Sequence, residues 1–556
     1  MCGLCGFTGE IVDRDAVLEN MTEVITHRGP DSKGFYTDDK ISMGFRRLSI
    51  IDLDNGSQPI YNEDKTLVLM FNGEIYNYKQ LRKELQEKGH VFATDTDSEV
   101  LVHGFEEWRE DLLNRLRGMF GFAIWNRTDE SLFIARDFFG IKPMHYTQVG
   151  GHFLYASEIK SILKFPGFEK KFNYRTLDNY LSFQYAVPPE TFFEGVYCLL
   201  PGHYLWYRDG KVETTRYWEA RFNPDESLTE EQAVDEIEKV FEESVNAHKI
   251  SDVEVGCFLS SGVDSSYVST YFADQKTFTV GFDFGEKYNE ISWAERLSKK
   301  IGVEHHTHLI SSEEFWGNVE HVQYHMDQPL ADPSCIALYF VSKLASEYVK
   351  VVLSGEGADE LFGGYPMYCQ AVHFMDYEHK VPKALRKAAG AVASKLPDFK
   401  GKHFLVRGAE EPWQRYMRAN YVFLDPAERD RCLKKNYHSP RPEQFFKPYF
   451  DKVQGLDEPT QLQWVDMHTW MLYDILLKAD RMSMANSLEL RVPFLDRNML
   501  DVALSIPQKY RSGKESTKIA LRGAAMKQLP ESVAHRKKLG FPVPLNDWLR
   551  EDKYYN

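Results

Sequence analysis

Features that mark membrane, secreted and nucleic-acid-binding proteins are missing from this sequence. No run approaches the roughly 18–20 apolar residues of a membrane-spanning helix, and the start of the chain shows no secretory signal. The seven cysteines are scattered, so they predict neither a disulfide framework nor a spaced zinc site. The net charge of −16 disfavours a broad phosphate-binding surface. These absences predict a cytoplasmic protein without nucleic-acid or membrane partners, in which a local site holds any nucleotide.

The length and composition of the chain predict a globular protein with more than one domain. Its 556 residues are too many for a single hydrophobic core. Hydrophobic residues make up 43% and charged residues 27%, and the mean hydropathy is −0.45, as in ordinary globular proteins. The pattern of the sequence changes around Pro188-Pro189, Pro201-Gly202 and Asn223-Pro224-Asp225, which predicts a boundary between about residues 205 and 230. We therefore expect one domain over residues 1–210 and another over residues 225–556.

The two predicted domains differ in their pattern of apolar residues. Short alternating runs at 40–45, 66–71 and 131–136, with helices at 13–26 and 77–88, predict an antiparallel α+β sandwich. After residue 229, apolar strands at 253–259, 277–282, 303–310 and 349–353 alternate with helices at 229–247, 264–273, 290–301 and 334–347. This alternation predicts an α/β domain with a doubly wound parallel sheet. Residues 360–556 are predicted to be largely helical.

The second residue of the chain is a cysteine, and its position gives it a chemical use. If Met1 is removed, Cys2 carries both a thiol and the free α-amine. An α-amine titrates near about pH 8 and a free thiol near about 8.5, so the amine can accept the proton of the thiol. The resulting thiolate is a nucleophile. An isolated cysteine here has an equally simple explanation as a small apolar residue of a first strand.

Three further segments supply what cleavage of a side-chain amide needs. They are Arg46–Asp52, Asn72–Asn77 and Thr94–Glu99. The Asn72 amide and the Gly73 N–H can stabilise an oxyanion. An arginine can hold the carboxylate of a substrate, and an acid can hold its ammonium. Taken singly, the segments are also explained as a strand end, a hairpin turn and an acidic helix cap.

These segments resemble the class II glutamine amidotransferase domain, an N-terminal-nucleophile glutaminase. The segments 27–31 and 135–143 also match its patterns, and the resemblance covers roughly residues 2–205. It implies that Cys2 is the nucleophile and general base, with Asn72 and Gly73 forming the oxyanion hole. Arg47 is preferred to Arg46 because it directly precedes Leu-Ser-Ile. The implied glutamine-binding set is Arg47, Leu48, Ser49, Ile50, Ile51, Asn72, Gly73, Glu74 and Asp97.

A second site is predicted where a buried strand runs into the segment Ser260–Ser266. A Ser/Gly loop between a strand and a helix start is typical of anion sites, because unpaired N–H groups point at the ligand. The segment lacks the Gly-Lys-[Ser/Thr] of a Walker loop, so P-loop γ-phosphoryl transfer is not indicated. Further along, the segment Ser354–Glu360 places three carboxylates after another strand. We expect Asp264 and Asp359 to share Mg²⁺ with pyrophosphate, since carboxylates repel phosphates unless a metal bridges them.

The pair of loops resembles the PP-loop ATP pyrophosphatases, and the whole chain resembles class B asparagine synthetases. The segments 327–334, 361–365 and 480–496 also match. The resemblance implies that ATP contacts Leu259, Ser260, Ser261, Gly262, Val263, Asp264, Ser265, Val280, Ser354 and Gly355. Glu356 is implied to support formation of a β-aspartyl-AMP intermediate. A homodimer is implied by the resemblance alone.

Two places depart from the family pattern or leave an alternative open. Some family members have lysine where this chain has Arg481, and Lys478 lies one helical turn away, so either cation can be the one that contacts the phosphates or intermediate. Near the end of the chain, Trp548 and Leu549 are expected to pack against a neighbour. We also expect a further natural segment after Asn556.

The resemblance implies a ligase that makes asparagine with AMP and pyrophosphate. By the same resemblance, we expect glutamine to be hydrolysed at Cys2 and the ammonia to attack an aspartate activated by ATP. One alternative keeps both half-reactions but amidates another carboxylate, for instance in a cell-wall precursor or a secondary metabolite. A remote alternative is a nonenzymatic ligand sensor. A sensor of this kind should have lost the catalytic residues of the family. Those residues are all present here: Cys2, Arg47, Asn72, Asp97, Asp264 and Asp359.

Overall fold

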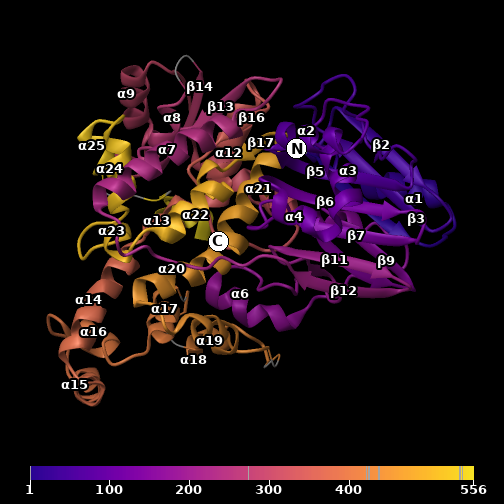
Figure 1. The fold of residues 1–556 in the computed structure, drawn as a ribbon. Helices are drawn as coiled ribbons and strands as arrows, with labels where there is room; N and C mark the ends of the chain where they lie inside the picture. The colour runs from indigo at the N-terminus through magenta and orange to yellow at the C-terminus, as the bar shows by residue number, and fades with distance from the viewer. Residues whose placement is uncertain are drawn as a thin grey trace.

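The computed structural model describes residues 2–272, 275–420, 422–423, 426–435, 437, 439–536, 540 and 542–555. Two antiparallel sheets lie at one side of the molecule, and a parallel sheet surrounded by helices lies at the other (Figure 1). Helices α14–α19 extend away from the parallel sheet (Figure 1). Among the described residues, none of the helices combines the length and the apolar character that crossing a bilayer requires.

The N-terminal region contains two six-stranded sheets in which every neighbouring pair is antiparallel. The first sheet has the order β10 (Tyr197–Cys198), β8 (His145–Val149), β9 (His152–Ala156), β1 (Gly3–Thr8), β3 (Ile41–Arg47) and β2 (Ser32–Thr37). The second has the order β12 (Lys211–Arg216), β11 (His203–Arg208), β7 (Ser131–Arg136), β6 (Gly118–Asn126), β5 (Leu67–Ile75) and β4 (Ile60–Tyr61).

The two sheets stack face to face, with helices on their outer faces. In β5, Val68 and Met70 pack against the first sheet, while Leu69 and Phe71 face the helices. This division follows from the two-residue period of a strand. Helix α1 (Arg14–Glu23) covers the first sheet, and α2 (Tyr78–Glu87) and α3 (Glu99–Trp108) cover the second. The predicted antiparallel sandwich is therefore confirmed.

The N-terminal region is more helical than the sequence predicted. The helices at 13–26 and 77–88 are confirmed as α1 and α2, but α3 was missed. Its first seven residues, from Glu99 to Phe105, are all buried, although Glu99, His103 and Glu106 recur at helical spacing. The remaining short helices are α4 (Leu112–Arg115), α5 (Ile159–Ile162), α6 (Leu177–Phe183) and the 3₁₀ turns η1 (Thr26–Arg28), η2 (Arg109–Asp111) and η3 (Tyr174–Thr176).

The C-terminal region is built on a five-stranded parallel sheet. Its order is β15 (Glu304–Ile310), β14 (Lys276–Phe282), β13 (Val255–Phe258), β16 (Val351–Leu353) and β17 (Glu489–Arg491). The chain begins at the central strand β13, moves outward through β14 and β15, and returns to β16 on the other side. This reversal confirms the predicted doubly wound sheet. It leaves a crevice at the carboxyl ends of β13 and β16, where such sheets bind ligands.

Helices surround this sheet and make up most of the remaining chain, as predicted. Those that alternate with the strands are α7 (Glu230–His248), α8 (Val263–Ser269), η4 (Glu286–Tyr288), α9 (Ile291–Ile301), α10 (Ser312–Gly317), α11 (Val319–Met326) and α12 (Ser334–Ser346). Those after β16 are α13 (Ala358–Phe362), α14 (Pro366–Lys380), α15 (Lys383–Lys395), α16 (Lys402–Arg407), α17 (Pro412–Asn420), α18 (Pro426–Arg431), α19 (Pro442–Val453), α20 (Glu458–His468), the π-helix η5 (Met471–Ile475), α21 (Leu476–Met484), η6 (Pro493–Leu495), α22 (Arg497–Ser505), α23 (Gln508–Arg511), α24 (Ile519–Met526), α25 (Glu531–Ala534), α26 (Leu545–Trp548) and α27 (Asp552–Tyr555).

The connection between the two regions is ordered by hydrogen bonds. Strand β12 runs to Arg216, past residue 210, and Thr229 caps α7 through a reciprocal capping box with Gln232. Between them, the Asn223 and Asp225 N–H groups donate to carbonyl oxygens at the end of α22, at 3.0 and 2.8 Å. The connection is thus fastened to the C-terminal region. The division into residues 1–210 and 225–556 stays a prediction.

The interface between the two regions contains a buried ion network. Arg28, on η1, is fully buried and pairs with Glu158 at 2.9 Å and with Asp480 of α21 at 2.8 Å. Arg481 pairs with the same Glu158 at 2.9 Å. Although burial disfavours the charged form of Asp480, the charge of Arg28 lowers the pKa of this carboxyl. The pairs join charges from both regions, so the network fixes how the regions are oriented.

Trp548 provides a test of the packing near the end of the chain. It is 1% exposed and packs against Phe282, Phe284 and Phe315, which gives it the neighbour that the sequence analysis expected. Trp548→Ala should lower the free energy of unfolding by about 3–5 kcal/mol, because it leaves a cavity. Leu549→Ala is the matched control, since Leu549 is 39% exposed. Denaturant titration checks both variants, and equal shifts would contradict the packing. A segment after Asn556 stays a prediction.

Candidate functional site

The thiol of Cys2 lies at the interface between the two regions. Its sulfur is 3.9 Å from the Leu48 carbonyl oxygen, and its own carbonyl accepts a hydrogen bond from Arg28 Nε at 3.1 Å. Burial raises the pKa of the Cys2 thiol above its ordinary value. The raised pKa favours the protonated thiol, so Cys2 needs a base to become a nucleophilic thiolate. Met1, whose removal would free that base, lies outside the described residues.

Asn72 and Gly73 lie beside Cys2 on strand β5. The Cys2 backbone nitrogen donates to Asn72 Oδ1 at 2.9 Å. The Asn72 Nδ2 is buried and makes no hydrogen bond to the described residues, so it is available as a donor. At Gly73 any Cβ would overlap the Met119 carbonyl oxygen of the paired strand β6, so only glycine fits. The structure therefore brings together the three residues that the sequence predicted for attack and oxyanion stabilisation.

Arg47 and Arg46 point in different directions from strand β3. The guanidinium of Arg47 donates to the carbonyl oxygens of Ile51 at 3.2 Å, Asp52 at 2.6 Å and Leu53 at 3.2 Å. Within the described residues it has no carboxylate partner. Arg46 instead pairs with Glu23 of α1. The alternation of a strand thus leaves Arg47 as the arginine whose charge is available for a substrate carboxylate.

Asp97 and Glu74 are two neighbouring buried acids of the N-terminal region. Asp97 accepts hydrogen bonds from Ile75 N–H at 2.9 Å and from the Ser98 hydroxyl at 3.3 Å. Burial raises the pKa of Asp97 to about 6. Burial and the charge of Asp97 also raise the pKa of Glu74 well above its ordinary value. One oxygen of Glu74 pairs with Arg491 of β17 at 2.8 Å, so this side chain is also part of the interface.

The segment after Arg47 starts beside the Cys2 thiol, at Leu48, and also contacts the C-terminal region. Leu48 and Ile50 are buried in the apolar cluster that contains the core of the parallel sheet. Ser49 N–H donates to Asp31 at 2.8 Å. The Ile50 carbonyl accepts from Asp252 N–H at 3.0 Å, and Ile51 packs against the same cluster. This segment is therefore held from both sides of the interface.

A cavity of about 400 Å³ lies at the carboxyl ends of β13 and β16. The predicted nucleotide residues that line it are Leu259, Ser260, Ser261, Gly262, Asp264, Ser265, Val280, Ser354 and Gly355, and Glu356 lines it too. Val263 does not, because its side chain is buried in the apolar core. The two loops touch: a Cβ at Gly355 would lie 2.8 Å from the Ser265 nitrogen. The volume of the cavity falls within the range of small-molecule sites.

Lys518 joins the two predicted metal ligands and was missed by the sequence analysis. Its Nζ lies 2.5 Å from Asp264 Oδ2 and 2.7 Å from Asp359 Oδ1. Lys518 directly precedes α24 and is 2% exposed. No local motif marked it, since it is one lysine in a polar segment far along the chain. The structure therefore shows that both carboxylates converge on one cationic group.

The two alternative cations of α21 occupy different places. Lys478 lines the cavity and pairs with Asp332 and with Asp474, the latter at 2.9 Å. Burial alone would lower the pKa of Lys478, but these two carboxylates raise it, so the ammonium stays charged. Arg481 does not line the cavity and pairs with Glu158 and Asp327, at 2.9 and 3.2 Å. The geometry therefore favours Lys478 as the cation that faces a nucleotide.

Helix α21 connects the two sites. Lys478 faces the cavity, whereas Asp480, two residues later, bonds Arg28, which in turn bonds the Cys2 carbonyl. The helix follows the π-helix η5 without a break. Such π segments occur frequently at functional sites. Residues two apart in a helix point to nearly opposite sides, so one helix has the cavity at one face and the thiol site at the other.

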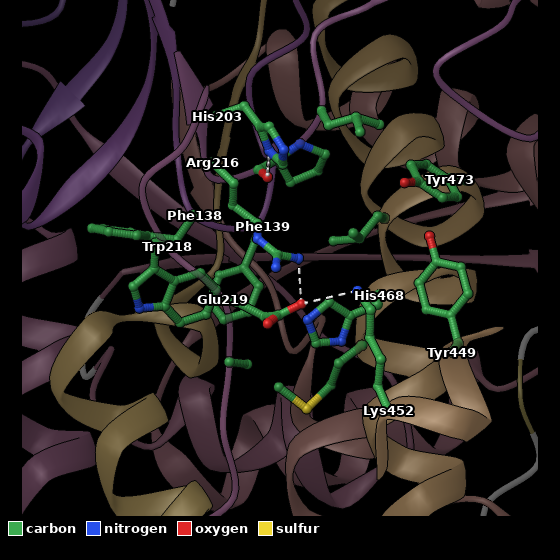
Figure 2. Close-up of a pocket in the computed structure, with 15 residues that line it drawn as sticks. Phe138, Phe139, His203, Arg216, Trp218, Glu219, Tyr449, Lys452, His468 and Tyr473 are labelled. Atoms are coloured by element: carbon green, nitrogen blue, oxygen red, sulfur yellow. Dashed lines mark hydrogen bonds and ion pairs between the residues drawn. The ribbon is translucent and has the colours of Figure 1, made fainter. Parts of the chain in front are cut away.

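A second, smaller cavity also lies between the two regions (Figure 2). Its volume is about 90 Å³. Phe138 and Trp218 approach it from the N-terminal side and His468 and Tyr473 from the helical side (Figure 2). At its edge Glu219 pairs with Arg216 and, at 3.5 Å, with Lys452. It contains none of the predicted site residues and is smaller than known ligand pockets.

Comparison with known proteins identifies both halves of the chain. Residues 1–218 match the family described as glutamine amidotransferase domain, and residues 236–556 match asparagine synthase. Asparagine synthetase (glutamine-hydrolyzing) 1 of Bacillus subtilis is 41% identical, covering 99% of this chain and 88% of its own length. A putative asparagine synthetase (glutamine-hydrolyzing) of Mycobacterium tuberculosis is 38% identical with the same coverage.

Similarity to solved structures is lower. The glutamine phosphoribosylpyrophosphate amidotransferase of B. subtilis has 16% identity and a TM-score of 0.31, covering 64% of this chain and 75% of its own, too little to bear on function. The two sequence families, in contrast, cover the region of the thiol site and the region of the cavity. The chain therefore belongs to the asparagine synthase family and begins with a glutamine amidotransferase domain.

Proposed function

We propose that this protein makes asparagine from aspartate, with glutamine as the nitrogen donor and ATP as the energy source. The observation that carries the proposal is the arrangement around α21, where Asp480 bonds Arg28 beside Cys2 and Lys478 lines the larger cavity. Two half-reactions that share ammonia gain from such an arrangement, because ammonia released into neutral water is protonated and is then no nucleophile. The proposal agrees with the relatives named asparagine synthetase. A homodimer stays a prediction.

In the first half-reaction, Cys2 attacks the side-chain amide of glutamine. The free α-amine of Cys2, positioned by Asn72 Oδ1, takes the thiol proton, and the thiolate forms a γ-glutamyl thioester. The Asn72 Nδ2 and the Gly73 N–H stabilise the oxyanion of the tetrahedral intermediate. Proton transfer to the departing nitrogen releases ammonia, and water then hydrolyses the thioester to glutamate.

Binding of glutamine uses two charges at the opposite end of the substrate. Arg47 is proposed to bind the α-carboxylate bidentately, because its guanidinium is held by carbonyl oxygens instead of a carboxylate. Asp97 is proposed to bind the α-ammonium, with Glu74 assisting. Leu48, Ser49, Ile50 and Ile51 would form the wall around the substrate. These contacts hold the amide carbon near the thiol.

In the second half-reaction, the β-carboxylate of aspartate attacks the α-phosphate of ATP. Pyrophosphate leaves, and β-aspartyl-AMP is formed with AMP as its leaving group. Ser260, Ser261, Gly262 and Ser265 are proposed to hold the phosphates, and Leu259 and Val280 the base. Glu356 lines the same cavity and is proposed to support the adenylation, while Lys478 balances negative charge. Ammonia then attacks the activated carbonyl to give asparagine.

The residues Asp264 and Asp359 fit a divalent cation. Both carboxylates lie against the same ammonium of Lys518, so both can reach one cation. Carboxylate and phosphate oxygens are the ligands that Mg²⁺ prefers. When bound here with ATP, Mg²⁺ neutralises phosphate charge and favours the departure of pyrophosphate. We therefore propose Asp264 and Asp359 as its protein ligands.

Replacing the nucleophile tests the division of labour between the sites. Cys2→Ala should lower glutamine-dependent asparagine synthesis by several orders of magnitude, because no thioester can form. Synthesis from added ammonium should continue, since the cavity is intact. Product is measured by mass spectrometry with both nitrogen donors. Loss of both activities in a folded variant would contradict the assignment.

Dependence on aspartate separates this function from its closest alternative. With glutamine and Mg-ATP present, pyrophosphate release should require aspartate, because adenylation needs the acceptor carboxylate. A coupled pyrophosphate assay with and without aspartate measures this. Release that other carboxylates support but aspartate does not would favour the alternative acceptor. Absence of any ATP turnover would favour a ligand-sensing role.

The raised pKa of Asp97 predicts how glutamine binding depends on pH. Because burial raises this pKa to about 6, Asp97 is ionised at pH 7 but mostly protonated at pH 5. Binding of an ammonium needs the ionised form, so the Kd of glutamine for the Cys2→Ala protein should rise about tenfold between pH 7 and pH 5. Calorimetry checks this without turnover. Asp97→Asn in the same background is the control and should bind weakly at every pH; a Kd that does not change with pH in the parent contradicts the assignment.

A further inference from the structure

A second cluster of ionisable side chains lies outside both proposed sites. Glu63 follows β4, His90 follows α2, and His103 and Glu106 lie one turn apart on α3. One ligand atom from each lies within 4.8 Å of those from the other three. His103 is completely buried, while Glu63 and Glu106 are exposed, so the cluster extends from the core to the surface.

The two histidine rings of the cluster have the same orientation. His103 Nε2 lies 3.2 Å from Glu99, and His90 Nε2 lies 3.2 Å from Glu107. The opposite nitrogen of each ring, Nδ1, faces Glu63, at 3.2 Å from His103 and 3.1 Å from His90. Metal-binding histidines typically direct one nitrogen to the ion and the other to a carboxylate, which fixes the ring. Both rings here have this arrangement.

The arrangement is electrostatically incomplete without a further cation. When Nε2 of a neutral ring donates to Glu99 or Glu107, its Nδ1 carries a lone pair. That lone pair faces a Glu63 carboxylate, which is also only an acceptor. The Nδ1 of His103 is buried and makes no hydrogen bond to the described residues. A buried lone pair that faces a carboxylate oxygen requires a proton or a metal ion between the two acceptors.

We propose that Glu63, His90, His103 and Glu106 bind one divalent transition-metal ion, with Zn²⁺ as the best fit. Two imidazole nitrogens and two carboxylate oxygens form a four-ligand set that suits tetrahedral Zn²⁺. Mg²⁺ and Ca²⁺ prefer oxygen ligands alone. Because four protein ligands leave no open position, the site is structural and not catalytic. Asn62 supports it by donating to Glu106 at 3.2 Å.

The ion would stabilise the segment that presents Asp97. Glu99, which holds His103, also accepts hydrogen bonds from the N–H groups of Ala93 at 2.6 Å and Thr94 at 2.7 Å. Asp97 lies between Thr94 and Glu99 in the chain. Removing the ion should therefore raise the KM for glutamine but leave synthesis from ammonium unchanged. This consequence rests on the proposed function, whereas metal binding itself does not.

Metal binding is tested on the full-length Cys2→Ala protein, so that the active-site thiol does not compete for the ion. After chelation and dialysis, calorimetric titration with ZnCl₂ should show one tight site per chain. Co²⁺ should give the visible absorption of a tetrahedral site without a thiolate charge-transfer band. Zn²⁺ should also raise the unfolding temperature, because it binds the folded state.

Variants connect the metal to these four residues. Glu63→Gln and Glu106→Gln alter exposed ligands, and each should remove the tight site without unfolding the protein. Glu107→Gln should weaken affinity by about 10–100-fold, since it removes only the carboxylate behind His90. His306→Gln is the control, because His306 pairs with Glu304 on β15, at 2.7 Å and in another sheet. It should leave Zn²⁺ binding unchanged.

Three outcomes would overturn the proposal. No tight binding would mean that protons occupy the cluster and that both histidines are charged. Equal binding by the parent and the Glu63→Gln/Glu106→Gln double variant would place the metal elsewhere. Loss of binding in His306→Gln would do the same. A normal Zn²⁺ site together with inactive enzyme would overturn the proposed function but not the metal site.

Discussion

The charge of Arg28, buried between two halves of one chain, is the constraint on which the rest of the structure depends. Glu158 of its own half and Asp480 of the other half neutralise it, and removing one partner of such a buried pair generally costs about 3–5 kcal/mol. The same guanidinium also holds the Cys2 carbonyl. The position of the thiol is therefore set by the interface as much as by its own strand. Displacing the halves would expose unpaired charges, so the domains are held in one arrangement.

The interface also explains how two chemically different sites can work on one substrate nitrogen. Ammonia is mostly protonated in neutral water and is then not a nucleophile, so an ammonia-using enzyme gains from a short protected path. Helix α21 provides the shared boundary, with Lys478 at the cavity and Asp480 beside the thiol site. Glu74 forms a second connection through Arg491, whose backbone carbonyl accepts a hydrogen bond at 3.0 Å from the N–H of Ser354, in the loop after β16. Short contacts thus connect the two sites, and binding at one site can affect the other through them.

Much of this could be predicted from the sequence because it is encoded locally. The two-residue period of β5 and the alternation of strands and helices after residue 229 depend on neighbouring residues, as do the loops at Ser260 and Ser354. Lys518 could not be found in this way, because it meets Asp264 across 254 residues and no motif surrounds it. Helix α3, in contrast, was missed although Glu99, His103 and Glu106 recur at helical spacing. The choice between Lys478 and Arg481 likewise depended on which side of a helix faces the interface, which spacing alone does not determine.

The ordered connection between the halves adds a consequence for evolution. Asn223 and Asp225 are hydrogen-bonded to the end of α22, so the linker behaves as part of the C-terminal domain and not as a flexible tether. A glutaminase domain transplanted from a paralogue would need matching partners for Arg28, Glu158 and Glu74 as well as for this connection. A substitution at one side of the interface therefore constrains which residues the other side can carry. Exchange by recombination should succeed only when it carries α21 and β17 along with the N-terminal half.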